Sequence, residues 1–385
     1  MEIIKKVVFI NIVLVFFNCS SNNEYTDIST DEINEEEVIV GTDEEILSSI
    51  LNLPLNSFEY NVALPNHFLG NGTQQEDNTP NNNPITNNGA TLGRVLFYDK
   101  QLSANNTVSC ASCHDQSKGF SDTKALSVGF NGGFTGRNSM GLSNAKYYNN
   151  GRFFWDERAS TLEEQVLLPI QDNVEMGLTL DELKSKVEDD SYYSILFRRA
   201  FGDEIVTTQR ISFALSQFIR SMVSYESKYD EGLMRTNNPQ ANFTNYSQSE
   251  NLGKSLFFSN RTRCSDCHDT NAFVGDEARN NGLDMVFTDE GVQRGEFKVP
   301  SLRNIELTGP YMHDGRFTTL AQVVEHYNSG VQNSQDLDGR LRQGNGVRRL
   351  NLSNAEKQAL VDFMLTLTDN SFITNEKFSN PFRNN

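Results

Sequence analysis

The sequence predicts a mainly α-helical protein with two similar domains and long loops. Apolar residues recur at intervals of three and four, which is typical of a buried helix face, and no run alternates as a strand would. An internal repeat is the second observation: 92-LGRVLF-97 and 252-LGKSLF-257 each lead into a CxxCH pentapeptide. We therefore expect one domain over residues 89–240 and another over residues 241–385.

Helix starts and buried faces can be placed individually. Capping boxes, in which a hydroxyl residue precedes a glutamate by three positions, favour helix starts. They occur at Ser160–Glu163, Thr179–Glu182, Ser247–Glu250 and Ser353–Glu356. The apolar spacing predicts two buried faces, formed by Ile211, Leu215, Phe218, Ile219 and Met222, and by Leu360, Val361, Met364 and Leu367.

The two CxxCH pentapeptides are typical of covalently attached c-type haem. The thiols bond to the haem vinyl groups, and the adjoining histidine ligates iron. The attachment residues would be Cys110, Cys113 and His114 in the first motif and Cys264, Cys267 and His268 in the second. A redox dithiol or half of a zinc site could share the CxxC spacing. The repeated histidine and the lack of further cysteines favour two haems, each in a cytochrome c-like domain.

The N-terminal residues predict export. Residues 1–18 carry two lysines and then a short apolar run, as a secretion signal does. Cys19 follows at once, which indicates an acylated lipoprotein, although an ordinary signal peptide or an uncleaved anchor are alternatives. Residues 19–88 are rich in Asn, Asp, Glu, Ser and Thr and predict a tether and linker, with Ile46–Leu55 docked on the body. The expected location is the periplasm or the outer membrane.

The charge balance excludes one class of partner. The chain has 51 acidic and 33 basic residues, with a formal net charge of −18. Such a balance argues against nucleic-acid binding and suits a basic redox partner.

Four stretches together carry a resemblance to a known family. They are the two CxxCH motifs about 150 residues apart, the segment FFWDERASTLEEQVLLPIQDNVEMG, and the segment KVPSLRNIELTGPYMHDGRFTTL. From about Ala90 to Phe382 the chain resembles the bacterial di-haem cytochrome c peroxidases, together with the related methylamine-utilisation enzyme MauG.

The resemblance implies three catalytic residues. Trp155 matches a tryptophan that relays electrons between the haems, and Gln165, ten residues later, matches a glutamine of the distal pocket. Glu175 matches the peroxidatic acid/base, because a carboxylate can accept a proton from one peroxide oxygen and return it to the other. From composition alone, Trp155 would be an ordinary buried indole, Gln165 a residue of an ordinary helix, and Glu175 a solvated acid.

The first departure from the family pattern concerns the first haem. Many members carry a histidine sixteen residues after the first motif, where this chain has Phe130, and no histidine lies between His114 and His268. We expect the first haem to be five-coordinate or bound only by water.

The second departure concerns the far ligand of the second haem. Peroxidases have a methionine fourteen residues after the histidine that corresponds to His313; here Tyr327 stands there, as a tyrosine does in MauG. Phenolate favours ferric iron, whereas thioether favours ferrous iron. His326 is the alternative ligand, and neighbours on a helix point about 100° apart, so only one can reach the iron.

The resemblance also implies a calcium ion. Its ligands would include the Asn138 side chain and the carbonyl groups of Thr308 and Pro310. Oxygen donors of this kind suit a hard cation. His67 lies outside the resembling segments, and we expect it to be a surface or loop polar group.

The resemblance implies a peroxidase that reduces hydrogen peroxide at the His114 haem. The His268 haem would receive electrons from a small cytochrome c or a cupredoxin. Two alternatives stay open: a MauG-like oxidase of a protein or organic substrate, which Tyr327 and Phe130 favour, and a non-enzymatic di-haem electron carrier. Homodimers are common in the family, but no residue pattern here decides the point.

Overall fold

The computed structural model describes residues 41–70 and 72–383. The expectations for residues 1–18 and for Cys19 lie outside these residues. Helix predominates, as expected, and the paired strands of the described residues are the short β1 (Arg342–Gln343) and β2 (Gly346–Val347). None of the described helices is long and apolar enough to cross a membrane.

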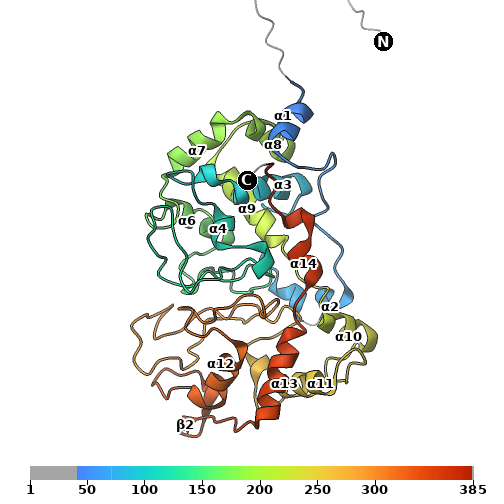
Figure 1. The fold of residues 1–385 in the computed structure, drawn as a ribbon, viewed down its shortest axis with the longest axis vertical. Helices are drawn as coiled ribbons and strands as arrows, with labels where there is room; N and C mark the ends of the chain where they lie inside the picture. Colours follow the sequence, from blue (N-terminus) through green and yellow to red (C-terminus); the bar gives the residue numbers. More distant parts are fainter. Residues whose placement is uncertain (1–40, 71, 384–385) are drawn as a thin grey trace, which may run out of the picture. The chain divides into compact units, whose positions relative to one another are not determined.

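The helices are joined by long loops (Figure 1). The α-helices are α1 (Asp43–Ile50), α2 (Asn66–Leu69), α3 (Asn87–Tyr98), α4 (Cys110–Cys113), α5 (Leu162–Gln165), α6 (Leu168–Gln171), α7 (Leu180–Asp189), α8 (Ser191–Phe201), α9 (Thr208–Arg220), α10 (Lys228–Thr236), α11 (Gln248–Phe257), α12 (Leu320–Glu325), α13 (Asn354–Leu365) and α14 (Asn370–Thr374). The 3₁₀-helices are η1 (Thr73–Glu76), η2 (Lys100–Leu102), η3 (Gln116–Lys118), η4 (Cys264–Asp266), η6 (Gly339–Leu341) and η7 (Glu376–Phe378), and η5 (His326–Gly330) is a π-helix.

The internal repeat appears as the same helix crossing in both halves. In the first half α3 packs on α9, and in the second half α11 packs on α13. A Cβ atom at Gly93 of α3 would lie 1.9 Å from the Ala214 carbonyl oxygen, and one at Gly253 of α11 would lie 1.8 Å from that of Ala359. The repeated glycine therefore lets two helix backbones touch, in the helix that precedes each CxxCH motif.

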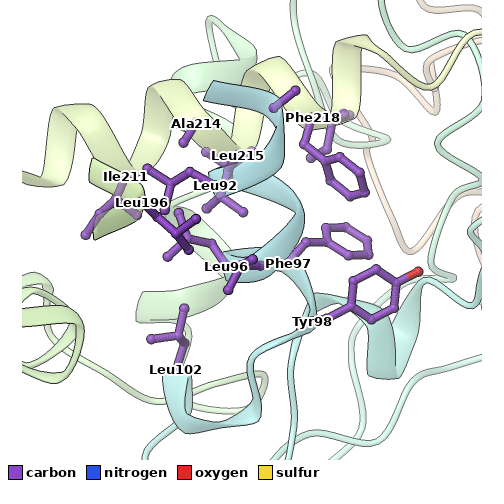
Figure 2. Packing of buried hydrophobic residues seen from close by; sticks show 14 of the residues in the cluster. Leu92, Leu96, Phe97, Tyr98, Leu102, Leu196, Ile211, Ala214, Leu215 and Phe218 are labelled. Carbon is purple, nitrogen blue, oxygen red and sulfur yellow. The ribbon is translucent and has the colours of Figure 1, made fainter. Parts of the chain in front are cut away.

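A large apolar cluster surrounds the first crossing (Figure 2). Its members come chiefly from α3, α8 and α9. They include Leu92, Leu96, Phe97, Leu196, Ile211, Ala214, Leu215 and Phe218. All five residues of the first predicted face are buried, because burial of apolar surface stabilises the fold by about 25 cal/mol per Å².

A second apolar cluster surrounds the crossing of α11 and α13. Leu360, Met364 and Leu367 of the second predicted face are buried in it, and Val361 packs at its edge. Membership of the two apolar clusters does not follow chain order strictly. Tyr229 of α10 already belongs to the second cluster, whereas Phe372 and Phe378 near the chain end belong to the first.

Parts of residues 43–70 and 72–88 pack on the rest of the protein. Leu47 of α1 and Leu51 are buried in the first cluster, which agrees with docking of Ile46–Leu55 on the body. Tyr60 is also buried, and its hydroxyl donates to the Lys377 carbonyl at 2.9 Å. A few apolar residues are thus enough to hold this polar stretch on the protein.

Three of the four predicted capping boxes form as expected, at Thr179, Ser247 and Ser353. The fourth is displaced by one residue. Thr161 caps α5 by accepting from the Glu164 amide, and Glu164 bonds back to the Ser160 amide. The predicted partner Glu163 instead forms an ion pair with the buried Arg220.

Candidate active site

The first CxxCH motif forms a single helical turn, α4, with its histidine half-buried. His114 Nδ1 lies 2.8 Å from the Phe120 carbonyl oxygen, which therefore accepts its proton. Burial lowers the pKa of His114. The imidazole is thus held neutral with Nε2 as its free nitrogen, which is the arrangement that metal-ligating histidines require.

The second motif repeats this arrangement. His268 Nδ1 faces the Phe273 carbonyl oxygen at 3.3 Å, and burial lowers the pKa of His268 to about 4. The two motifs therefore present equivalent imidazoles, one in each half of the repeat.

The thiols of both motifs do not suit the redox-dithiol alternative. All four are free, and burial raises the pKa of each. A reactive dithiol needs a lowered thiol pKa. In the described part of the chain no cluster of His, Cys, Asp and Glu completes a metal site with them. The surroundings thus favour covalent haem attachment.

A cavity of about 220 Å³ opens beside the second motif and is lined by Cys264, Cys267 and His268. Its wall also contains Arg279 and Arg348, whose buried Nε atoms have no hydrogen-bond partner among the described residues. Buried guanidinium groups require acceptors. The two propionate groups of a haem would supply them, so the residues present fit this cofactor.

Trp155 connects the two halves of the repeat at this cavity. The half-buried indole lines the cavity, and its N–H donates to the Asn138 carbonyl at 2.8 Å. The Trp155 carbonyl accepts from the Lys298 amide at 2.8 Å. The backbone N–H of Asn138 in turn donates to the His313 carbonyl at 2.7 Å. Continuous hydrogen bonds therefore fix the indole against the wall of the second site.

Glu175 lies beside the first motif, because its charge contributes to the raised pKa of both Cys110 and Cys113. It sits in the turn after α6, where Asp172 Oδ1 accepts from its amide at 3.1 Å. Burial, with repulsion from Asp172, raises the pKa of Glu175 to about 6, against an opposing effect of Arg158. The carboxylate is therefore half-buried, and its pKa lies close to neutral pH.

Phe130 packs directly against the Glu175 turn. Its amide donates to the Glu175 carbonyl at 3.1 Å, and a Cβ atom at Gly177 would lie 2.5 Å from its ring. Gln165 ends α5, and its half-buried side chain has no hydrogen-bond partner among the described residues. The sequence position where a histidine could close the first site is thus filled by an apolar ring.

The neighbouring side chains of Tyr327 and His326 lie in different surroundings. Tyr327 lines the cavity, and burial raises the pKa of its phenol to about 12. His326 lies outside the lining, and its Nε2 is 3.1 Å from the Asn281 carbonyl oxygen. Met312, which was not among the predicted site residues, also lines the cavity. Only the position of its thioether next to His313 could have indicated this from the sequence.

The three expected calcium ligands, Asn138, Thr308 and Pro310, are all among the residues that line the cavity. The side-chain Nδ2 of Asn138 donates to the carbonyls of Lys124 and Ala125 at 3.1 and 3.2 Å, which leaves its Oδ1 as an acceptor. The donor set is one of neutral oxygens, which a calcium site can use.

His67 is not the surface polar group that was expected. Its Nε2 lies 2.8 Å from Oδ1 of the fully buried Asp230, which also forms an ion pair with the buried Arg303. These residues are far apart in the sequence, so no local pattern could have revealed them. The cluster ties the segment before α3 to the second half of the chain.

The fold and the paired motifs define a helical protein with two equivalent candidate haem sites. A family model described as di-haem cytochrome c peroxidase matches residues 87–238 and 247–371. The chain belongs to this family of oxidoreductases, whose description implies two haems.

Two curated relatives and one solved structure illustrate the likeness. The methylamine utilization protein MauG of Methylophilus methylotrophus is 33% identical over 297 residues, which cover 75% of this chain and 84% of the relative. The cytochrome c551 peroxidase of Nitrosomonas europaea is 35% identical over 248 residues, which cover 61% and 71%. The crystal structure of a MauG-like protein associated with microbial copper homeostasis superposes with a TM-score of 0.67 at 33% identity, covering 78% of this chain and 95% of that one.

Proposed function

We propose that the protein is a di-haem c-type peroxidase, which reduces hydrogen peroxide to water with two electrons and two protons. The observation that carries this proposal is Glu175, a half-buried carboxylate beside the first thiol pair with a pKa of about 6. A general base with a pKa near the working pH is suited to moving a proton between two oxygens.

A haem bound by Cys110, Cys113 and His114 would supply the redox-active iron at which the peroxide is cleaved. The Glu175 carboxylate accepts a proton from one peroxide oxygen and returns it to the other. Gln165 orients the peroxide through its unpaired carboxamide. The Phe120 carbonyl keeps His114 in the tautomer that presents Nε2.

The second site is the electron store. Cys264, Cys267 and His268 would hold its haem, and Tyr327 would be a further iron ligand, since Tyr327 lines the cavity and His326 does not. Trp155 passes electrons between the two sites. They arrive from a small cytochrome c or cupredoxin, and a net charge of −18 suits a partner with a basic docking face.

A second candidate function is a MauG-like oxidase, which would withdraw electrons from a protein or organic substrate. Tyr327 on the cavity wall favours it, as does the 33% identity to a MauG protein. A steady-state assay with peroxide and reduced cytochrome c separates the candidates. Fast turnover supports the peroxidase, whereas negligible turnover with oxidation of an added substrate supports the oxidase.

The same proposal includes export to the periplasm, with Cys19 as a lipidated tether to the outer membrane. It also includes one calcium ion, held by the Asn138 side chain and by the carbonyls of Thr308 and Pro310. Asn138 supports this assignment, because its Nδ2 donates to two carbonyls and its Oδ1 stays available as a ligand.

Replacement of Glu175 by Gln tests the peroxidase proposal. The rate of reaction with hydrogen peroxide, measured by stopped-flow absorbance, should fall by a factor of about 10² or more, because general acid–base catalysis supplies that much. Glu188→Gln on α7 is the matched control, since that carboxylate is exposed and pairs only with Lys184. An unchanged rate for Glu175→Gln would favour the non-enzymatic carrier.

The coordination of the first haem is tested separately. Because Phe130 fills the position of the closing histidine, the fully oxidised protein should show a high-spin first haem without prior reduction. Electron paramagnetic resonance of the oxidised protein checks this point. A bis-histidine low-spin signal from the first haem would refute it.

A further inference from the structure

Tyr148 and Glu157 form a buried pair beside the turn that carries Trp155. The Tyr148 hydroxyl donates to Glu157 Oε1, and Asn150 Nδ2 donates to Glu157 Oε2 at 2.7 Å. Tyr148 is 0% exposed and Glu157 is 5% exposed. Because both carboxylate oxygens accept hydrogen bonds, the arrangement suits the ionised form of Glu157. A buried phenol thus directs its proton at a buried carboxylate.

Two sets of contacts join this pair to Trp155. The Glu157 amide donates to the Phe154 carbonyl at 3.3 Å, so Trp155 and Glu157 belong to one turn. The Lys298 amide donates to the Trp155 carbonyl at 2.8 Å, and its Nζ lies over the Tyr148 ring. Because consecutive Cα atoms are about 3.8 Å apart, those of Trp155 and Glu157 lie within about 7.6 Å of each other. The phenol and the indole therefore flank the same turn.

The turn is held in a conformation that residues with side chains rarely adopt. Phe154 has a φ of 69° and Glu157 a φ of 52°, both in the left-handed region. Such positions cost free energy and persist where surrounding contacts fix them. Arg152 Nε donates to the Glu157 carbonyl at 2.9 Å, and Lys298 Nζ donates to the Arg152 carbonyl at 3.1 Å. The fold thus keeps Glu157 at the Trp155 turn despite this cost.

We propose that Tyr148 is a redox-active residue, which gives one electron to oxidised Trp155 while its phenolic proton passes to Glu157. The step converts an indole radical cation, a phenol and a carboxylate into a neutral indole, a neutral tyrosyl radical and a carboxylic acid, so charge and electrons balance. This inference rests on the proposed function, because hydrogen peroxide is the terminal oxidant. Of the two electrons that peroxide takes, one comes from haem iron and one from Trp155, which Tyr148 then restores.

The proton acceptor is what allows a buried phenol to be oxidised. Tyr148 belongs to a third apolar cluster, with Phe68, Tyr147, Val223, Ala272 and Val274. Loss of an electron alone would leave an unpaired positive charge in this cluster, which is costly. Transfer of the proton to Glu157 leaves both groups neutral. Burial and the Glu157 carboxylate raise the pKa of Tyr148, so the phenol keeps its proton until it is oxidised.

The described residues contain a second phenol–carboxylate cluster that serves as a control. Tyr192 and Tyr193 of α8 donate to Asp99 Oδ2 at 3.0 and 2.7 Å, and all three residues are buried. Among the hydrogen bonds of the described residues, none joins Asp99 to the Trp155 turn. Tyr193→Phe therefore removes one hydroxyl from a buried carboxylate, as Tyr148→Phe does, but leaves the contacts of Trp155 intact.

The test mixes the haem-loaded protein with one equivalent of hydrogen peroxide, without an electron donor, and freezes it at once. Electron paramagnetic resonance detects the radical, and incorporation of ring-deuterated tyrosine narrows the signal of a tyrosyl radical only. We expect a tyrosyl signal in wild-type protein and in Tyr193→Phe. Tyr148→Phe should lose the signal. Glu157→Gln should also lose it, because an amide can accept the hydrogen bond but not the proton.

Each other outcome overturns the inference. A signal that persists in Tyr148→Phe assigns the radical to another residue, and one that persists in Glu157→Gln excludes the carboxylate as the proton acceptor. Loss of the signal in Tyr193→Phe as well shows a general effect of removing a buried hydroxyl. Wild-type protein that consumes peroxide without a tyrosyl signal overturns the inference and leaves the proposed function intact. Wild-type protein that does not react with peroxide overturns both.

Discussion

Arg158 is the residue that tunes the candidate base. Its guanidinium lies over the Phe154 ring, with 3.6 Å between its Cζ and the ring centroid, and its charge lowers the pKa of Glu175. Burial and Asp172 act in the opposite direction and prevail, so the pKa lies at about 6. Below that pH the carboxylate is protonated and cannot accept a proton. The peroxide reaction should therefore fall as the pH decreases through about 6.

Replacement of Arg158 by Leu should move this acid limb to higher pH, because one charge that favours the carboxylate is removed. The shift should be less than about one unit, since the arginine is largely exposed and screened by solvent. Arg158→Lys keeps the charge and serves as the control. The pH profile of the second-order rate with peroxide measures the effect, and an unmoved limb would contradict it.

Sites whose residues are close in sequence can be predicted from the sequence, and sites assembled from distant loops cannot. Cys110 and His114 are neighbours in the chain, so their common site can be predicted from spacing alone. Asn281 Nδ2 and the Met312 sulfur lie 3.4 Å apart only because the loops that carry them fold over one cavity. A pair of this kind leaves no periodic or local pattern, and only the structure reveals it.

At the scale of elements, the glycines at the two helix crossings make a sharp prediction. Gly93→Ala should lower the free energy of unfolding by about 1–3 kcal/mol or more, because its Cβ would collide with the Ala214 carbonyl oxygen, which cannot move without α9. Gly136→Ala is the control, since a Cβ there meets nothing within 4 Å. Urea denaturation measures both variants.

Gly253→Ala should behave like Gly93→Ala, because the crossing of α11 and α13 has the same contact. A repeat whose two halves responded differently would mean that one crossing can adjust. Equal destabilisation would indicate that both halves depend on close helix packing.

Helices with one buried face could be predicted from the sequence. Their starts could also be predicted where a single hydroxyl residue had a glutamate three positions later. The start of α5 could not be predicted in this way. Both Ser160 and Thr161 have a glutamate three positions later, so the sequence allowed two capping boxes. The choice is made by Arg220 on α9, which pairs with Glu163 and leaves Glu164 for the cap. A contact between distant residues thus decides a local feature.

At the scale of the whole molecule, the buried cluster of His67, Asp230 and Arg303 joins parts of the chain that are far apart in sequence. Asp230→Asn should lower the free energy of unfolding by about 3–5 kcal/mol, because it leaves the fully buried Arg303 without a counter-charge. Asp203→Asn, which breaks an exposed pair with Arg210, should change stability little. Thermal unfolding of the two variants makes the comparison.

The same aspartate predicts how stability depends on pH. Burial alone would raise the pKa of Asp230, but Arg303, His67 and Ser227 together lower it well below its usual value. A depressed carboxyl pKa stabilises the fold at all pH values above the unfolded-state pKa of about 4. This contribution is lost as the pH falls further, and acid unfolding of Asp230→Asn should lack it.

The end of the chain closes the first half of the fold. Phe372 and Phe378 are buried in the first cluster, and Gln116, just after the first haem motif, donates to the Asn375 carbonyl at 2.9 Å. Arg94 Nε donates to the Ser379 carbonyl at 2.6 Å. A segment that follows the whole second half in sequence therefore completes the core of the first half. If Cys110 and Cys113 attach a haem as proposed, both thiols are synthesised well before the core around them is complete.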